Sequence, residues 1–344
     1  MATLGTSRTP RVLRFGSDFS GLDSAYLALK RLNVPVRHCF CSDKDAKCLS
    51  LLQALHKPEV CFDDVTLRKA EEESYVDLYL TTPPCQAFSA AGQGHGAADG
   101  RGTLISSSMK YVQHKRPRCV VVENVRGLLQ KKHRPIYRGI LKTFKKLGYV
   151  VSSRVLDAQD YQVAQVRKRV FIVAIRRRDS RRQRFEWPKP LGKRSLSAIL
   201  DPPVRTDKPG RLPKSERPKK LARMAMSKIW AQGVDPCKVP CAIDVGCSER
   251  YLTWKVGVAP TLCRARGGSG GFWLSSRGRK TTLRELMRIT GINPEELQGW
   301  EACCTGPQLG QMLGNSVPMP LIQAVLQNAL LASGLLTQSR SNAT

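Results

Sequence analysis

A cysteine that follows two prolines is the residue best suited to covalent chemistry in this sequence. It stands in the run Thr82-Pro83-Pro84-Cys85-Gln86, just past a short apolar stretch. The prolines stiffen the backbone before Cys85, and residues 90–103 form a Gly/Ala-rich segment that could close over a cleft. A buried structural cysteine is the alternative, but such a residue rarely needs a Pro-Pro brace beside a glycine-rich loop. We therefore expect Cys85 to serve as a thiolate nucleophile.

Polar residues in two later segments could assist this nucleophile. Glu123 follows the apolar run 119–122, so we expect its carboxylate at the same edge of a sheet as Cys85. Further along, Gln165, Arg167 and Arg169 alternate with other residues before an apolar run, and alternation along an extended chain points them to one side together. The pattern predicts a carboxylate and several hydrogen-bond donors near the cysteine.

A glycine-bearing turn and several acids could bind a nucleotide-like cofactor. The turn is Asp18-Phe19-Ser20-Gly21-Leu22-Asp23, between a strand and a helix, where α/β sheets bind such molecules. Asp43 is placed to hydrogen-bond a ribose hydroxyl, and Asp63-Asp64-Val65 could contact an adenine edge. The segment 314–318 opens the last helix, where backbone amides and Asn315 could meet a cofactor. Taken singly, each acid is better explained as a helix cap or a solvated loop carboxylate.

These candidate residues need a scaffold, and the apolar pattern predicts one of alternating strands and helices. An uninterrupted apolar run such as 119–122 is typical of a strand buried on both faces. We therefore expect an α/β fold with a Rossmann-like, mostly parallel sheet and helices on both faces. The expected strands are 12–15, 36–41, 77–80, 119–122, 150–156 and 169–175, and the expected helices are 24–32, 46–55, 104–113, 136–147, 282–290 and 318–336.

The periodic pattern disappears after Ile175, which indicates a second domain. Residues 176–184 are dense in arginine, and residues 187–220 are rich in proline and lysine. We assign residues 1–178 and 308–344 to a catalytic domain and residues 179–307 to a small, loop-rich recognition domain. The glycine-rich segment 267–271 is interpreted as a flexible loop that either approaches a nucleic-acid groove or merely connects.

Charge is the strongest compositional signal. The 344 residues include 57 Lys+Arg against 27 Asp+Glu, for a net charge of +30, which favours a polyanionic partner. The basic stretches 176–184 and 205–220 suit phosphate contacts, although a solvated linker or a targeting signal would have the same composition. Charge alone does not separate DNA from RNA or from an anionic membrane surface.

Neither membrane insertion nor secretion is indicated. No stretch approaches the roughly 20 apolar residues of a membrane span, and the first residues lack the apolar core of a secretory signal. The twelve cysteines form no compact framework, and the irregular spacing of Cys237, Cys241, Cys247 and Cys263 favours buried free thiols over a zinc site. We expect a soluble intracellular monomer without a metal, in the nucleus of a eukaryote or the cytoplasm and nucleoid of a bacterium.

Taken in order, these motifs resemble those of the cytosine-C5 DNA methyltransferase family. The resemblance covers most of the chain outside roughly residues 180–275, the span of a variable recognition domain, and Leu283-Arg284-Glu285 resembles the family's element before the final helix. The matching motifs are Phe19-Ser20-Gly21, Asp43, Asp64-Val65, Pro84-Cys85-Gln86, Arg101-Gly102-Thr103-Leu104, Glu123-Asn124-Val125, Gln165-x-Arg167-x-Arg169 and Gly314-Asn315-Ser316-Val317-Pro318.

The resemblance implies a reaction and a cofactor. Cys85 adds to C6 of a cytosine flipped out of the duplex, Glu123 holds N3 and the exocyclic amine, and Arg167, together with Arg169, positions the base carbonyl and the nearby backbone. The methyl donor is S-adenosylmethionine, and double-stranded DNA is the partner. The implied cofactor-binding residues are Phe19, Ser20, Gly21, Asp43, Lys44, Asp64, Val65, Leu104, Asn315 and Ser316.

Three positions depart from the family pattern, and all bear on the cofactor more than on the reaction. Asp23 stands where the family usually carries a glycine, Lys44 stands where an aromatic residue often stacks on adenine, and Ala164 replaces a proline. A tRNA cytosine-C5 methyltransferase shares this catalytic core, but its Cys-Phe-Thr element does not occur in this sequence. A catalytically silent, nucleic-acid-binding regulator is the other alternative, and intact Cys85 and Glu123 argue against it.

Overall fold

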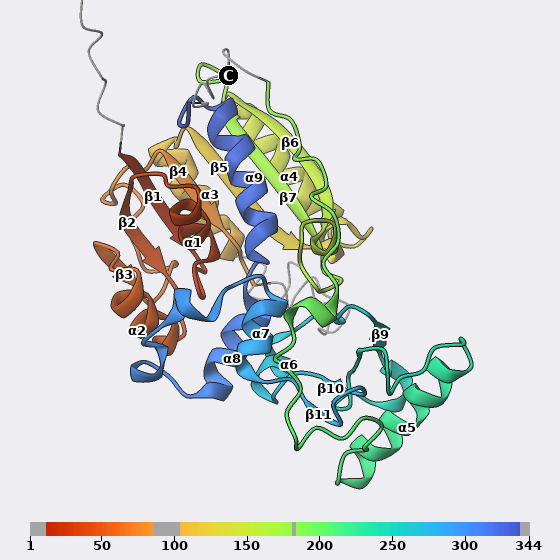
Figure 1. Ribbon diagram of the computed structural model, residues 1–344. Coiled ribbons are helices and arrows are strands. Elements are labelled where there is room, and N and C mark those ends of the chain that lie inside the picture. The colour runs from red at the N-terminus through yellow and green to blue at the C-terminus, as the bar shows by residue number, and fades with distance from the viewer. Residues whose placement is uncertain (1–11, 85–103, 181–183, 338–344) are drawn as a thin grey trace, which may run out of the picture.

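The main sheet has seven strands in the order β3-β2-β1-β4-β5-β7-β6 (Figure 1). The computed structural model describes residues 12–84, 104–180 and 184–337. Strand β7 runs antiparallel to both of its neighbours, and the other pairings are parallel. This mostly parallel sheet confirms the expected α/β fold class. The strands are β1 (Leu13–Asp18), β2 (Val36–Ser42), β3 (Val60–Phe62), β4 (Leu78–Thr81), β5 (Cys119–Val125), β6 (Tyr149–Asp157) and β7 (Lys168–Arg176).

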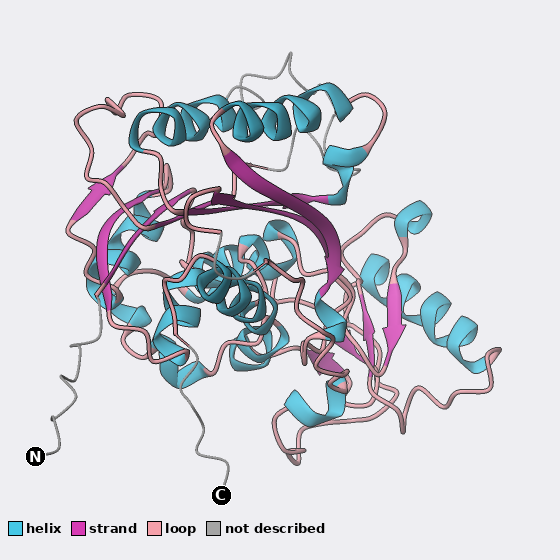
Figure 2. Cartoon of the chain, turned by 90° about the horizontal axis from the view of Figure 1, so that it is seen from above, coloured by secondary structure: helices cyan, strands magenta, loops and turns pink. Residues whose placement is uncertain are grey.

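Helices cover both faces of the sheet (Figure 2). On one face α1 (Ser24–Arg31), α2 (Ala46–Leu55) and α9 (Met319–Ala332) share a hydrophobic core with β1 and β4. On the other face α3 (Leu104–Lys115) and α4 (Arg134–Lys146) build a second core against β5 and β6. The apolar run in β5 is buried on both sides, as its composition predicts. The strand and helix predictions hold because strong apolar periodicity fixes which faces are buried.

A separate four-stranded sheet with the order β11-β10-β8-β9 lies beside the main one (Figure 1). It is antiparallel throughout and packs against α5 (Glu216–Trp230), an element that the sequence analysis missed. The strands are β8 (Cys241–Ile243), β9 (Trp254–Val256), β10 (Trp273–Leu274) and β11 (Arg279–Lys280). All of these elements fall inside 179–307, whereas α7 (Leu283–Ile289) contributes to the core of the large sheet. The boundaries of the recognition domain therefore remain a prediction.

The glycine-rich segment 267–271 is packed rather than loose, so its interpretation as a flexible loop was wrong. Helix α6 (Arg264–Gly268) lies against α8 (Gly306–Asn315) so closely that a Cβ on Gly267 would meet the carbonyl oxygen of Gly310. A Cβ on Gly314 would lie 2.3 Å from the carbonyl oxygen of Cys263.

Asn315 ends α8 and does not open the last helix, because Pro318 and the turn before it separate α8 from α9. None of the helices in the described ranges is long and apolar enough to cross a membrane.

Candidate active site

Four parallel strands end together at one edge of the main sheet, which we call the carboxyl edge. Asp18 at the end of β1 is in register with Ser42 of β2 and Thr81 of β4, and Thr81 is in register with Val122 of β5. The residues that follow these strands must therefore converge, as the sequence analysis expected. Cys85 lies outside the described residues, so the site is built from its neighbours.

The segment that leads to Cys85 is fastened at three points on the carboxyl edge. The amide of Thr82 donates to the carbonyl of Asp18 at 3.2 Å, and its hydroxyl donates to the carbonyl of Phe19 at 2.9 Å. The side-chain amide of Asn124 donates to the carbonyl of Pro83 at 3.4 Å. The chain is thus anchored to the cofactor turn on one side and to β5 on the other, two residues before Cys85.

Glu123 is buried and forms an ion pair with Arg169. It is 7% exposed, and its carboxylate lies 3.1 Å from Nε of Arg169. Arg169 pairs in register with Val125, which places it diagonally across from Glu123 on the same face of the sheet. Burial raises the pKa of Glu123, while the charges of Arg169 and Arg167 oppose that shift. This carboxyl group therefore holds its proton to higher pH than an exposed glutamate does.

Arg167 and Gln165 are both buried, and both bind backbone groups of distant segments. Arg167 is buried and donates to the carbonyls of Leu262 at 2.5 Å, Gly314 at 3.3 Å and Ser316 at 3.0 Å. Gln165 accepts from the amide of Leu262 at 2.8 Å and donates to a carbonyl at the end of α7 at 3.2 Å. These contacts tie the ends of α7 and α8 to the strand that carries Arg169. In this arrangement Arg167 holds other segments, and Arg169 is the arginine beside the buried carboxylate of Glu123.

The cofactor turn is built on left-handed backbone. Phe19, Gly21 and Asp23 have φ angles of 56°, 55° and 46°. The amide of Gly21 donates to the carboxylate of Asp43 at 2.8 Å, and the amide of Asp45 donates to its other oxygen at 2.9 Å. Burial raises the pKa of Asp43, and these two backbone hydrogen bonds oppose the rise. Asp43 therefore fixes the turn while keeping lone pairs free to accept further hydrogen bonds.

The remaining cofactor candidates that the structure describes differ in accessibility. Asp64 accepts hydrogen bonds from the hydroxyl and amide of Thr66, and these, with the Lys44 ammonium 2.9 Å away, lower its pKa to about 2. Val65 is buried beside it. Across the edge, Asn315 is exposed at the end of α8. Ser316 is buried and its hydroxyl donates to a carbonyl of α8 at 2.8 Å, and Leu104, half-buried, begins α3.

Asp23, where the family usually has glycine, is part of a buried polar cluster that the sequence analysis did not identify. Its carboxylate accepts from the amide of Tyr26 at 3.1 Å and the hydroxyl of Ser17 at 2.7 Å, and lies 3.3 Å from Nε2 of His38. Burial disfavours the charged form, but the hydrogen bonds and charge of His38 outweigh it and lower the pKa of Asp23. The hydroxyl of Ser17 also contacts that of Ser20 at 2.7 Å, which links the cluster to the cofactor turn.

A second unpredicted pair, Asp18 and Arg68, is buried on the opposite face of β1. The guanidinium of Arg68 makes a bidentate contact with the carboxylate of Asp18, at 2.5 and 2.6 Å. Its Nε lies 2.6 Å from Glu73, and its plane is surrounded by the rings of Phe40, Phe62 and Tyr111. Arg68 therefore anchors the loop that carries Asp64 and Val65 to the strand that leads into the cofactor turn.

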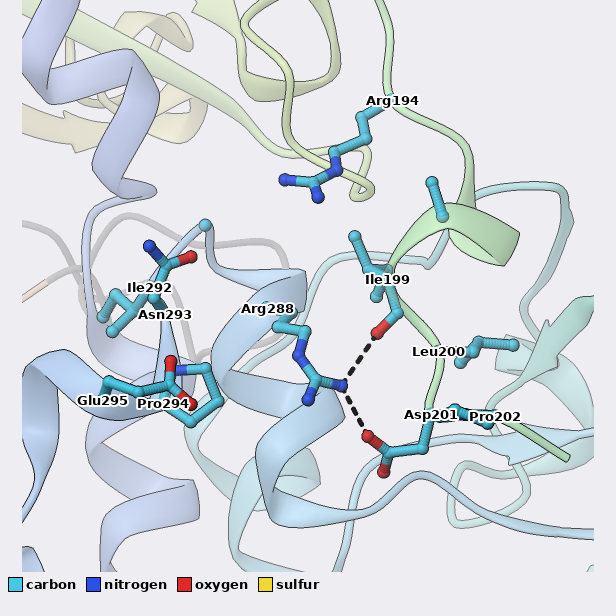
Figure 3. Close-up of a pocket in the computed structure, with 12 residues that line it drawn as sticks. Arg194, Ile199, Leu200, Asp201, Pro202, Arg288, Ile292, Asn293, Pro294 and Glu295 are labelled. Carbon is cyan, nitrogen blue, oxygen red and sulfur yellow. Dashed lines mark hydrogen bonds and ion pairs between the residues drawn. The ribbon is translucent and has the colours of Figure 1, made fainter. Parts of the chain in front are cut away.

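A cavity of about 260 Å³ lies between residues 194–202 and 288–295, away from these residues (Figure 3). Arg288 spans it and donates to the carbonyl of Ile199 at 3.1 Å and to the carboxylate of Asp201 at 2.6 Å. None of the predicted site residues in the described ranges lines it. The cavity therefore lies between residues 194–202 and the segment that contains the end of α7, apart from the carboxyl edge.

Within the described part of the chain no cluster of His, Cys, Asp and Glu could hold a metal ion, and every described cysteine is a free thiol. Cys237, Cys241, Cys247 and Cys263 differ in burial: Cys241 is buried, Cys237 and Cys247 are half-buried, and Cys263 is exposed. The expectation that all four are buried was therefore too simple.

Comparisons with known proteins agree with this geometry. Residues 13–330 match the family model for C-5 cytosine-specific DNA methylases. The type II methyltransferase M.HhaI of Haemophilus parahaemolyticus is 28% identical over 325 residues, which are 92% of this chain and 94% of that protein. M.DsaV of Dactylococcopsis salina is 28% identical over 322 residues, 92% of this chain and 86% of that protein. The crystal structure of the S. pombe Dnmt2 methyltransferase shares the fold, with a TM-score of 0.64 and 15% identity over 92% of this chain and 98% of that one. The chain therefore belongs to the C-5 cytosine-specific DNA methylase family and is a DNA cytosine methyltransferase.

Proposed function

We propose that the protein transfers a methyl group from S-adenosylmethionine to C5 of a cytosine in double-stranded DNA, through a covalent bond between Cys85 and C6. One observation carries this proposal: the segment before Cys85, which follows β4, is hydrogen-bonded to the end of β5 that bears buried Glu123. Asn124, which holds Pro83, is the residue next to Glu123. An acid and a nucleophile supplied this way can engage N3 and C6 of the same ring.

The carboxyl edge fits S-adenosylmethionine. A Cβ on Gly21 would meet no described atom within 4 Å, so the backbone of the turn faces open space. Asp43 keeps acceptor capacity for ribose hydroxyls, and Val65 and Asp64 offer an apolar contact and an acceptor for adenine. Asn315 is exposed at the end of α8. When bound, the cofactor supplies an electrophilic methyl group on a sulfonium.

The residues of this chain prepare the base for that methyl group. The Cys85 thiolate adds to C6, and the electron pair of the C5–C6 bond becomes available at C5. Glu123 hydrogen-bonds N3 and the exocyclic amine, and its raised pKa suits a group that shares a proton with N3 as the ring accepts electron density. Arg169 meets the base carbonyl, while Arg167 holds Leu262 and Ser316 in place. Once C5 carries the methyl group, its proton passes to solvent, the electron pair of the C5–H bond re-forms the C5–C6 double bond, and the Cys85 thiolate leaves C6.

Methyl transfer from labelled S-adenosylmethionine tests the proposal, with duplex DNA and tRNA as separate substrates. We expect label in DNA, abolished by Cys85→Ser and reduced at least about 100-fold by Glu123→Gln. Cys61→Ser, a half-buried cysteine on β3, is the matched control and should stay active. Label in tRNA but not in DNA contradicts the substrate, and an active Cys85→Ser variant contradicts the mechanism.

The covalent bond has its own test. Duplex DNA with 5-fluorocytosine at the target carries a fluorine where the C5 proton must leave, so elimination of Cys85 is blocked. We expect a protein–DNA adduct that survives denaturation, formed by the natural protein and by Cys61→Ser. The absence of an adduct from a protein that methylates ordinary DNA contradicts the covalent step.

A further inference from the structure

The outer face of α4 carries a row of positive charges that the proposed reaction does not use. Between Glu123 and Asp157 the sequence contains nine Lys and Arg residues and no acidic residue. All nine are exposed. Arg134, Arg138, Lys142 and Lys146 follow one another at intervals of four, and we call these four residues the α4 row.

Helix periodicity places the α4 row on one line. The residues buried by α4, Ile140 and Phe144, face the sheet and belong to the core on the α3 side. A spacing of four residues brings each member of the row about 6 Å along the helix from the one before, so the row spans about 18 Å. Like charges at this spacing destabilise a helix, and a row kept at that cost needs an anionic partner to offset it.

The described part of the chain offers the row no neutralising carboxylate. In the part of the chain that the structure describes, no carboxylate lies within ion-pair distance of Arg138, Lys142 or Lys146. Some exposed cations elsewhere are paired, as Lys220 is with Glu249 and Arg37 with Glu59. The α4 row therefore presents its full charge to the solvent.

One end of the row lies at the carboxyl edge. Strand β5 ends at Val125 beside the catalytic carboxylate, and α4 begins nine residues later and runs back toward the start of β6. Figure 1 shows α4 on the face of the sheet opposite α9, alongside β6 and β7. The positive row thus starts at the carboxyl edge and leads away from it.

We propose that the α4 row binds the phosphate backbone of the substrate duplex beyond the target site. This inference rests on the proposed DNA substrate. An 18 Å row matches about five phosphates of one strand at 3.4 Å per phosphate. An anionic membrane fits less well, because surface-bound helices insert an apolar face and the apolar face of α4 is buried in the core.

Salt-dependent binding to duplexes of two lengths tests this surface. The variant Arg138→Gln/Lys142→Gln/Lys146→Gln removes three charges, and Lys30→Gln/Lys57→Gln/Lys69→Gln removes three exposed charges away from α4. On a duplex of about 40 base pairs, we expect the α4 variant to lower the slope of log K against log salt by roughly 2 to 3, because each phosphate contact contributes about 0.9. The control variant should leave the slope unchanged.

Comparing duplexes of two lengths distinguishes DNA binding by the α4 row from DNA binding at the reaction site. A duplex of about 14 base pairs offers the row fewer phosphates, so on it we expect the α4 variant to lose less affinity than on the long duplex and to methylate the DNA as the natural protein does. The proposal would be overturned if both variants lost equal DNA affinity or if neither lost any. It would also be overturned if the α4 variant bound DNA normally and lost only its binding to vesicles that contain anionic lipid. DNA binding is measured separately from methyl transfer. If the protein methylated no DNA, the proposed function would be contradicted, and the binding comparison would still test the α4 row.

Discussion

Replacing Asp23 by glycine and by alanine should separate two roles of this residue. Asp23 caps α1 with a left-handed backbone, at φ 46°, and its buried carboxylate contacts Ser17, the Tyr26 amide and His38. Both variants lose the carboxylate and leave His38 without this partner. Only alanine keeps a Cβ in the left-handed region, which costs about 1–2 kcal/mol.

The magnitudes follow from these differences. Loss of an N-cap side chain costs about 1 kcal/mol when alanine replaces it and a few tenths when glycine does. Asp23→Ala should therefore be less stable than Asp23→Gly by roughly 1.5–3 kcal/mol. Asp23→Gly itself should fall only about 0–2 kcal/mol below the natural protein, because relief of backbone strain offsets part of the lost charged hydrogen bonds.

Urea unfolding measures the stabilities, and calorimetric titration with S-adenosylmethionine measures the effect on the cofactor turn. Asn33 provides a matched control, because it is exposed and also left-handed, at φ 52°, so Asn33→Ala and Asn33→Gly report the backbone cost alone. We expect Asp23→Gly to bind the cofactor within a few-fold of the natural protein and Asp23→Ala to bind more weakly. Equal stabilities for the two Asp23 variants would refute the backbone argument, and natural stability in both would refute a role for the carboxylate.

Three further predictions follow from other buried groups. Burial raises the pKa of Glu73 to about 7 despite its ion pair with Arg68. The folded protein therefore binds a proton at Glu73 more tightly than the unfolded chain does. This contribution to stability is fully present below about pH 4.5 and is lost as the pH rises toward 7. Between these pH values, urea unfolding should show the free energy of unfolding of Glu73→Gln rising by up to about 3 kcal/mol relative to that of the natural protein. A difference in stability that does not change with pH contradicts the raised pKa. Asn124→Asp keeps the side-chain shape but removes the donor to the Pro83 carbonyl, so methyl transfer should slow about tenfold while S-adenosylmethionine titrates unchanged; unaltered turnover refutes this tether. Gly310→Ala places a Cβ 2.3 Å from a backbone oxygen of α6, and thermal unfolding should show a loss of about 1–3 kcal/mol, whereas an unchanged midpoint would mean that the two helices separate freely.

Most of the large sheet and the carboxyl edge could be predicted because they depend on local pattern. Helix α2 begins and ends where the sequence predicts, at Ala46 and Leu55, and β5 extends the predicted run by three residues. Parallel strands end at a common edge, so placing Asp43 and Glu123 after two such strands was enough to bring them to one region. No knowledge of tertiary contacts was needed for that step.

Partners across long sequence separations could not be predicted. Alternation indicates that Arg167 shares a side with the polar residues two positions away, but its carbonyl partners lie 95 to 149 residues away. The pairing of Asp18 with Arg68 and of Asp23 with His38 likewise depends on which strand faces which loop. Helix α5 was missed for a different reason, since its many basic residues and proline hid an apolar face of only four buried positions.

The end of β5 links Glu123 to the segment that precedes Cys85, although the two are distant in sequence. Successive residues of a strand point to opposite faces, so Glu123 can turn toward Arg169 while Asn124 turns toward Pro83. A shift of this strand end would therefore act on Glu123 directly and on the segment before Cys85 through the hydrogen bond from Asn124. The run that precedes Glu123 is buried on both faces, which holds the strand end in place.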